Sequence, residues 1–287
     1  MANEITKTNN QVNTKVSFTN FMTSNLMKQK VNDILGDEKK ASRFTSSIVS
    51  AVNNNPQLAE CNNMSILSGA LLGESLNLSP SPQLGRFYLL PFKDKERGMV
   101  AQFVLGYKGY LELALRSGQY KNINVIEIRE GEYLGRNKET GNPTFEFIED
   151  DDLRENKDII GYMASFTLEN GFTKTLYWSK KKMEEHALQY SSGYRADKKN
   201  KTQYTFWSKD FTGQAFKTML RQLISKWGLM SIDMQQAFEK DMGTINEDGS
   251  VTYVDNVDDL DFTPTVSYIE KEEEPQEPQT KSLNDVE

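Results

Sequence analysis

Cysteine and histidine are nearly absent from this chain, which has 287 residues but only Cys61 and His186 of these two types. A single cysteine excludes an internal disulfide and a zinc site built from four cysteines. A single histidine leaves no histidine pair to hold a metal ion, and His186 lies in a charged helical stretch that suits a surface or capping role. We therefore predict no metal site.

Long apolar runs are also missing, because no stretch approaches the roughly 20 residues that a membrane helix needs. The first fifteen residues are polar and rich in asparagine, without the apolar core of a secretory signal. These absences predict a soluble cytoplasmic protein that does not bind membranes.

A phosphate-binding loop for ATP hydrolysis is absent as well, since no segment matches G-x-x-x-x-G-K-[ST]. We predict no catalytic residue and no required cofactor, and an influence of Mg²⁺ stays open. One enzymatic alternative is a metal-dependent nuclease that uses Glu127, Glu130 and Glu132 with the acidic stretch 149–152. No basic residue stands at a matching catalytic spacing, so this alternative is the less favoured one.

The net charge of −7 conceals a strong segregation of charge. Residues 241–287 hold fourteen acidic and two basic residues, whereas residues 174–226 hold twelve basic and four acidic ones. A basic body with an acidic tail is typical of proteins that bind nucleic acid. We expect a disordered N-terminus at 1–20, one folded domain at 21–240, and an acidic, largely disordered tail at 241–287.

The periodicity of apolar residues predicts an α+β fold, in which a small antiparallel sheet is backed by helices and the N-terminal part is helical. The alternation in 161–178 predicts a hairpin, because Asn170-Gly171 suits the tight turn between its strands. Strands are also expected at 87–92, 99–105, 123–129 and 144–149, helices at 21–35, 42–52, 65–76, 109–117, 179–189, 209–227 and 231–240, and loops at 131–143 and 193–205.

The segment 102–118 joins a strand, a turn and a helix, and reads QFVLGYKGYLELALRSG. Gly106 and Gly109 flank Tyr107 and Lys108, and glycine lets the backbone turn sharply and approach another group closely. An aromatic ring and a cation on such a turn suit a nucleotide, whose base stacks and whose phosphate attracts positive charge. Tyr107 and Lys108 are therefore candidate DNA contacts, with Tyr107 as a core residue the alternative.

Two arginines near this segment are candidates of the same kind. Arg116 lies on the polar side of the expected helix, and Arg86 precedes a strand beside Gly85. Arg116 has a structural alternative, because Glu112 stands four residues earlier and the two side chains can form an ion pair.

The expected helix 209–227 is amphipathic. Its apolar face is formed by Ala215, Phe216, Met219, Leu220, Leu223 and Trp227. Lys217 and Arg221 recur on the opposite face, where they can follow the phosphates along one wall of a groove. The alternative is a core helix with an ordinary solvated side.

The most basic part of the chain interleaves cations with aromatic residues. The candidate DNA contacts here are Lys180, Arg195, Lys198, Lys199, Lys201, Trp207 and Lys209, and the neighbouring aromatic residues are Tyr190, Tyr194, Tyr204 and Phe206. Proteins that hold single strands combine cationic grooves with aromatic platforms on which bases stack. A solubilising lysine-rich loop beside core aromatics is the structural alternative.

Three blocks of the chain together resemble the RecT family of phage and prophage single-strand annealing proteins. They are residues 76–92 (LNLSPSPQLGRFYLLPF), 99–119 (MVAQFVLGYKGYLELALRSGQ) and 216–223 (FKTMLRQL). The resemblance extends from about residue 64 to about residue 238. Within it, Lys217 and Arg221 match a basic pair of the family, and Trp207 stands near a position where the family has tryptophan.

This resemblance implies that 21–240 is a domain for DNA binding, annealing and oligomerisation. Its β-hairpin and helix core is expected to assemble into a ring or helical filament. It implies single-stranded DNA and annealed duplex as partners, with a companion exonuclease or the host single-strand-binding protein engaged through the C-terminal tail. The expected function is annealing of complementary strands in recombination without ATP. A single-stranded RNA or DNA binder without annealing activity, and an assembly protein without nucleic acid, remain alternatives.

Overall fold

The computed structural model describes residues 16–94, 96–246 and 248–253. The expected disordered segment 1–20 lies mostly outside these residues, and so does the part of the expected tail after Tyr253. None of the helices in the described part combines the length and apolar character that crossing a bilayer requires.

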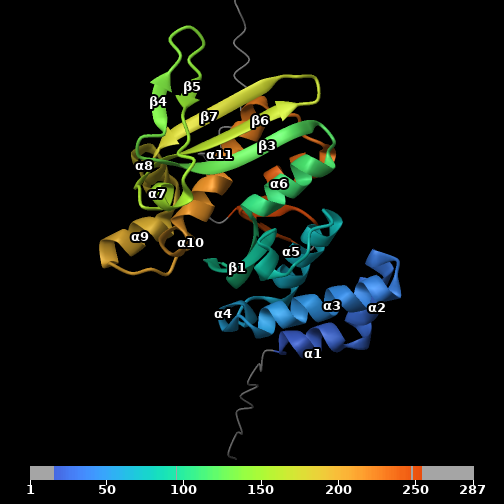
Figure 1. Ribbon diagram of the computed structural model, residues 1–287. Helices are drawn as coiled ribbons and strands as arrows, with labels where there is room; N and C mark the ends of the chain where they lie inside the picture. Colours follow the sequence, from blue (N-terminus) through green and yellow to red (C-terminus); the bar gives the residue numbers. More distant parts are fainter. Residues whose placement is uncertain (1–15, 95, 247, 254–287) are drawn as a thin grey trace, which may run out of the picture.

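Five helices form the N-terminal part, in agreement with the prediction of a helical region (Figure 1). They are α1 (Phe18–Thr23), α2 (Asn25–Leu35), α3 (Glu38–Asn53), α4 (Pro56–Ala59) and α5 (Asn63–Ser75). Each begins after a residue whose side chain accepts a hydrogen bond from the first helical turn, for example Asp37 before α3 and Asn62 before α5. These short polar caps explain why one chain segment divides into several helices.

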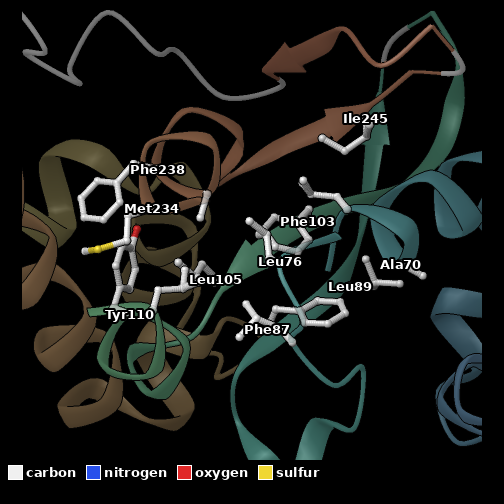
Figure 2. Packing of buried hydrophobic residues seen from close by; sticks show 14 of the residues in the cluster. Ala70, Leu76, Phe87, Leu89, Phe103, Leu105, Tyr110, Met234, Phe238 and Ile245 are labelled. Atoms are coloured by element: carbon white, nitrogen blue, oxygen red, sulfur yellow. The ribbon is translucent and has the colours of Figure 1, made fainter. Parts of the chain in front are cut away.

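The first sheet has the order β1-β2-β8-β9, built from β1 (Phe87–Asp94), β2 (Gly98–Leu105), β8 (Gly243–Ile245) and β9 (Val251–Tyr253). β1 and β2 correspond to the strands predicted at 87–92 and 99–105, and they pair antiparallel with Phe87 opposite Leu105. α5 lies against this sheet, and Figure 2 shows Ala70 and Leu76 near Phe87, Leu89 and Phe103. The short η1 turn (Pro82–Leu84) precedes β1.

The second sheet has the order β3-β6-β7, with β3 (Tyr120–Arg129), β6 (Ile159–Leu168) and β7 (Thr173–Ser179). β6 and β7 form the predicted hairpin, and Gly171 of its turn has φ of +86°, a value that glycine tolerates. A separate ribbon of β4 (Tyr133–Arg136) and β5 (Pro143–Phe145) projects beyond this sheet (Figure 1), although the sequence predicted a loop over most of it. α7 (Asp151–Glu155) follows the ribbon.

The remaining helices connect the two sheets. They are α6 (Tyr107–Arg116), α8 (Lys180–Tyr190), α9 (Ser192–Asn200), α10 (Phe206–Lys209), α11 (Phe211–Trp227) and α12 (Ile232–Lys240). α11 packs on β6, β7 and α6, and buries Met219, Leu220 and Leu223. On one side of Leu105, Tyr110 meets Phe238 edge-on with ring centroids 4.7 Å apart (Figure 2). The α+β fold with small antiparallel sheets is therefore confirmed.

The structure corrects several expectations about element boundaries. The expected helix 21–35 is divided between α1 and α2, and the expected strand 144–149 is only the short β5. The lysine-rich segment 193–205, expected as a loop, is largely the helix α9. The expected helix at 209 begins at Phe211, so that Trp207 and Lys209 belong to the short α10. The acidic tail does not begin at Asp241, because Asp241 is fully buried and β8 and β9 follow it.

Candidate nucleic-acid interface

The start of α6 lies against the chain that leads into β1. The helix begins at Tyr107 rather than after a turn, and the amide N–H of Gly106 donates to the carbonyl oxygen of Arg86 at 2.8 Å. A Cβ atom on Gly106 would overlap the carbonyl oxygen of Gly85, so this position requires glycine. The predicted close backbone approach is therefore present, and it brings Lys108 next to Gly85.

Three predicted cations gather here, and we call Arg86, Lys108 and Arg116 the α6 cluster. Together with Glu112 they line a surface hollow of about 560 Å³. Arg86 Nε lies 2.5 Å from a Glu112 oxygen, and Arg116 donates to the carbonyl oxygen of Leu76 at 2.6 Å. The hollow is lined by three cations and one carboxylate, so the cluster keeps an excess of positive charge for an anionic ligand.

The second group of predicted cations is exposed on the side of the molecule formed by α8, α9 and α10 (Figure 1). We call it the α8–α10 cluster, and it consists of Lys180, Arg195, Lys198, Lys199, Lys201 and Lys209. A hollow of about 510 Å³ is lined by Lys180, Lys198 and Lys201. The structure thus brings together three lysines that lie up to 21 positions apart in the sequence.

Two members of this cluster also have structural contacts. Arg195 donates to the carbonyl oxygens of Leu188 at 2.8 Å and Gln189 at 2.6 Å, which caps the end of α8. Lys198 Nζ lies 2.9 Å from Glu184 and 5.2 Å from the ring centroid of Tyr194. The hydrogen bond to Glu184 raises the pKa of Lys198, so this side chain stays charged.

A buried carboxylate holds the end of this surface in place. Asp197 is 3% exposed and accepts hydrogen bonds from the hydroxyls of Thr202 at 2.6 Å and Ser208 at 2.7 Å, and from the amide of Thr205 at 2.8 Å. These donors, the Thr202 hydroxyl first among them, hold the pKa of Asp197 well below its usual range. The loop between α9 and α10 is consequently well defined, and it presents Tyr204 with 79% of its surface exposed.

The aromatic residue chosen from the sequence is not the most accessible one. Trp207 is half-buried and meets Phe211 edge-on, with ring centroids 5.2 Å apart. Tyr204 and Phe206, which flank the same stretch, are both exposed. The interleaving of aromatic and basic residues indicated the right segment, but it did not distinguish the packed ring from the accessible ones.

Tyr88 links the two clusters and was missed from the sequence. Its ring centroid lies 5.7 Å from that of Phe206 in α10, and its hydroxyl approaches Gly85 beside Lys108. Burial raises the pKa of Tyr88, with smaller contributions from Asp210 and Tyr107. The only signal in the sequence was its position in the strand β1. Side chains alternate between the two faces of a strand, so Tyr88 points away from the face that buries Phe87 and Leu89.

Tyr107 packs inside rather than presenting a free ring. It is half-buried at the start of α6 and meets Phe216 of α11 edge-on, with ring centroids 5.6 Å apart. The alternative of a core tyrosine therefore fits its surroundings better than a stacking platform does.

Lys217 and Arg221 do not line a solvated wall, which corrects the expectation for α11. Lys217 is 7% exposed, and its Nζ lies 3.0 Å from Oδ1 of the fully buried Asp241. Arg221 Nη1 lies 2.9 Å from Asp241 Oδ2 and 2.8 Å from the hydroxyl of Tyr110. The helical period shows which residues share a face, but not that a distant part of the chain covers this face.

The Asp241 cluster, which we define as Lys217, Arg221, Tyr110 and Asp241, joins four parts of the fold. Asp241 also accepts from the amide N–H of Leu105 at 2.8 Å, at the end of β2. Burial raises the pKa of Asp241, but the two cations and the hydrogen bonds outweigh this and leave it lowered. Burial lowers the pKa of Lys217, and Asp241 opposes that change.

Two of the carboxylates considered for a nuclease, Glu127 and Glu132, are paired with arginine. Glu132 is fully buried, with Arg154 Nε 2.7 Å from one of its oxygens. Glu127 lies 3.3 Å from Arg129 and 3.8 Å from Arg154. Arginine thus occupies the positions around these oxygens, and the network fixes the base of the β4–β5 ribbon rather than presenting free ligands.

The chain is similar to known proteins over most of its length. The chain is 38% identical over 239 residues to the uncharacterized protein YqaK of Bacillus subtilis (strain 168), covering 83% of this chain and 74% of YqaK. It is 29% identical over 230 residues to Protein RecT of Escherichia coli (strain K12), covering 77% and 78% of the two chains. The model of the RecT family matches residues 42–253, which end at the last strand of the first sheet. The chain therefore belongs to the RecT family.

Proposed function

We propose that this protein binds single-stranded DNA and anneals complementary strands in homologous recombination, without nucleotide hydrolysis. The observation that carries the proposal is the exposed α8–α10 cluster beside the accessible rings of Tyr204 and Phe206, in a chain of the RecT family. The α6 cluster adds positive charge on the other side of Tyr88.

The mechanism follows from the charges. Lysine and arginine neutralise the phosphates of one strand and release its counterions, which holds the strand on the surface. Base pairing with a second strand then supplies sequence specificity, while the protein lowers repulsion between strands and raises their local concentration. No step calls for a catalytic residue, a metal or another cofactor.

The proposal extends to assembly and partners. We expect copies of the chain to form a ring or helical filament in the cytoplasm, on single-stranded DNA and the annealed duplex. The acidic residues after Tyr253 are the proposed contact for a companion exonuclease or a single-strand-binding protein, since eleven acids and two bases lie there.

The test is annealing of two complementary oligonucleotides without nucleotide, across a salt series. We expect faster annealing that declines as salt rises. Single-strand binding without faster annealing would favour a general nucleic-acid-binding protein, and shortened strands would favour a nuclease.

A pair of variants tests which cations contact the phosphates. Lys199→Ala with Lys201→Ala should weaken single-strand binding and reduce the slope of log affinity against log salt by about 1.4, or about 0.7 per lost phosphate contact. The matched control is Lys28→Ala with Lys30→Ala, which removes the same charge from exposed positions of α2. Equal effects of the two pairs would remove the α8–α10 cluster from the interface.

A further inference from the structure

A groove beside the two clusters differs from them in chemistry. It has a volume of about 850 Å³ and lies between α3 and α4 on one side and β1 on the other. Its polar lining includes Ser47 and Ser50 of α3, Asn54 just after α3, and Gln83. Among the described residues that line it, none carries a formal charge. A volume of this size is within the range of ligand sites.

Aromatic side chains form part of the opposite wall. Tyr88 of β1 and Phe206 of α10 both line the groove, with ring centroids 5.7 Å apart. Phe206 is 39% exposed although it is a large apolar residue. Its ring is therefore available to a ligand that enters the groove, and such rings bind flat unsaturated groups by stacking.

Positively charged side chains lie close to these two rings. Tyr88 lies beside Gly85 and Lys108 of the α6 cluster, and Phe206 is followed in α10 by the exposed Lys209. An anionic group binds most favourably at the cations. The uncharged groove instead offers hydroxyl and amide groups together with aromatic surface. One ligand that presents both chemistries is a single nucleic-acid strand, with charged phosphates and flat bases that carry hydrogen-bonding edges.

We propose that this groove binds nucleobases of a single strand whose phosphates lie on the flanking cations, with Phe206 and Tyr88 as stacking residues. The inference rests on the proposed function and adds a base-binding site to it. The groove takes only a few bases for each copy of the protein, and the other bases remain outside for pairing with a second strand.

The first experiment compares Phe206→Ala with the wild type on two oligonucleotides of equal length, one with bases and one abasic. Loss of a stacked base predicts affinity for the normal strand lower by about 5- to 150-fold. The abasic strand should bind both proteins equally, and the slope of log affinity against log salt should be unchanged, because no phosphate contact is lost. Phe172→Ala is the control, since Phe172 is 45% exposed on the β6–β7 turn away from the groove.

A second measurement locates the base directly. A strand containing 5-iodouracil is irradiated on the wild-type protein, and the cross-linked peptides are identified by mass spectrometry. We expect cross-links at Tyr88 or Phe206, and fewer at α10 in Phe206→Ala.

The outcomes separate the two proposals. If the wild type binds and anneals DNA, two results overturn the base site alone. One is that Phe206→Ala lowers the affinity for normal and abasic strands equally. The other is that Phe206→Ala lowers neither affinity and no cross-link is found in the groove. A wild type that does not bind single-stranded DNA overturns both.

Discussion

Asp241→Asn should destabilise the fold far more than Lys217→Met, although both remove one charge from the same cluster. The wild-type cluster holds the buried Lys217 and the partly buried Arg221 around one buried carboxylate. Asparagine keeps the shape of the side chain but removes the negative charge that faces Lys217 and Arg221. Removing one partner of a buried ion pair costs about 3–5 kcal/mol, a large share of the total stability of about 5–15 kcal/mol that a domain has.

Methionine at position 217 leaves a balanced arrangement, because Asp241 keeps Arg221, the Tyr110 hydroxyl and the Leu105 amide as partners. Its length and apolar character also suit the buried position, so we expect a change of within about 1 kcal/mol. Lys217→Met should leave the salt dependence of DNA binding unchanged, since the side chain does not reach the surface.

The assay is urea unfolding followed by circular dichroism. With a slope of about 3 kcal/mol/M, the loss in Asp241→Asn lowers the midpoint by roughly 1–2 M. Equal midpoints for Asp241→Asn and wild type, or a larger loss in Lys217→Met, would refute the account of the cluster as one carboxylate that holds two cations.

Three further predictions concern other parts of the molecule. Burial lowers the pKa of His186 from 6.5 to about 4. Between pH 6.5 and pH 4, His186 is therefore protonated in the unfolded chain but neutral in the folded chain. Stability should fall by up to about 3 kcal/mol as pH drops from 6.5 to 4, and His186→Phe should lack this component of the pH dependence in parallel urea titrations. Gly106→Ala should cost about 1–3 kcal/mol in thermal unfolding, because the methyl group meets the Gly85 carbonyl; an equally stable variant would contradict that overlap. A chain ending at residue 253 should unfold like the full protein in calorimetry, whereas one ending at residue 240 should be much less stable without Asp241; equal behaviour of the two truncations would argue against a role for β8 and β9.

Features specified by neighbouring residues could be predicted from the sequence. The β6–β7 hairpin follows from Asn170-Gly171 between alternating strands, and α8 begins after Ser179, whose hydroxyl accepts from the amide of Lys182 at 3.2 Å. The basic segment of the candidate interface could also be predicted, because its lysines are close together along the chain.

Features specified by distant residues could not. The burial of Lys217 depends on Asp241, which reads as the first acid of a tail until β8 is seen to pair with β2. α9 could not be predicted from the sequence, because its C-terminal end depends on hydrogen bonds that Asp197 accepts from Thr202 and Thr205, which follow the helix. Likewise, Tyr88 and Phe206 are brought together from segments more than a hundred residues apart.

The pairing of β2 with β8 has a consequence for the synthesis of the protein. The amide of Leu105 donates to Asp241, which lies 136 residues later, and the carbonyl of Phe103 accepts from the amide of Met242. Neither hydrogen bond can form until these later residues have been synthesised. At 5–20 residues per second, a ribosome needs on the order of 10 s to make the intervening chain. During that interval β2 has one open, strongly apolar edge, which neighbouring nascent chains can join. Slower translation should lengthen this exposure, so the fraction of chains that aggregate during synthesis should depend on how quickly residues 106–242 are translated.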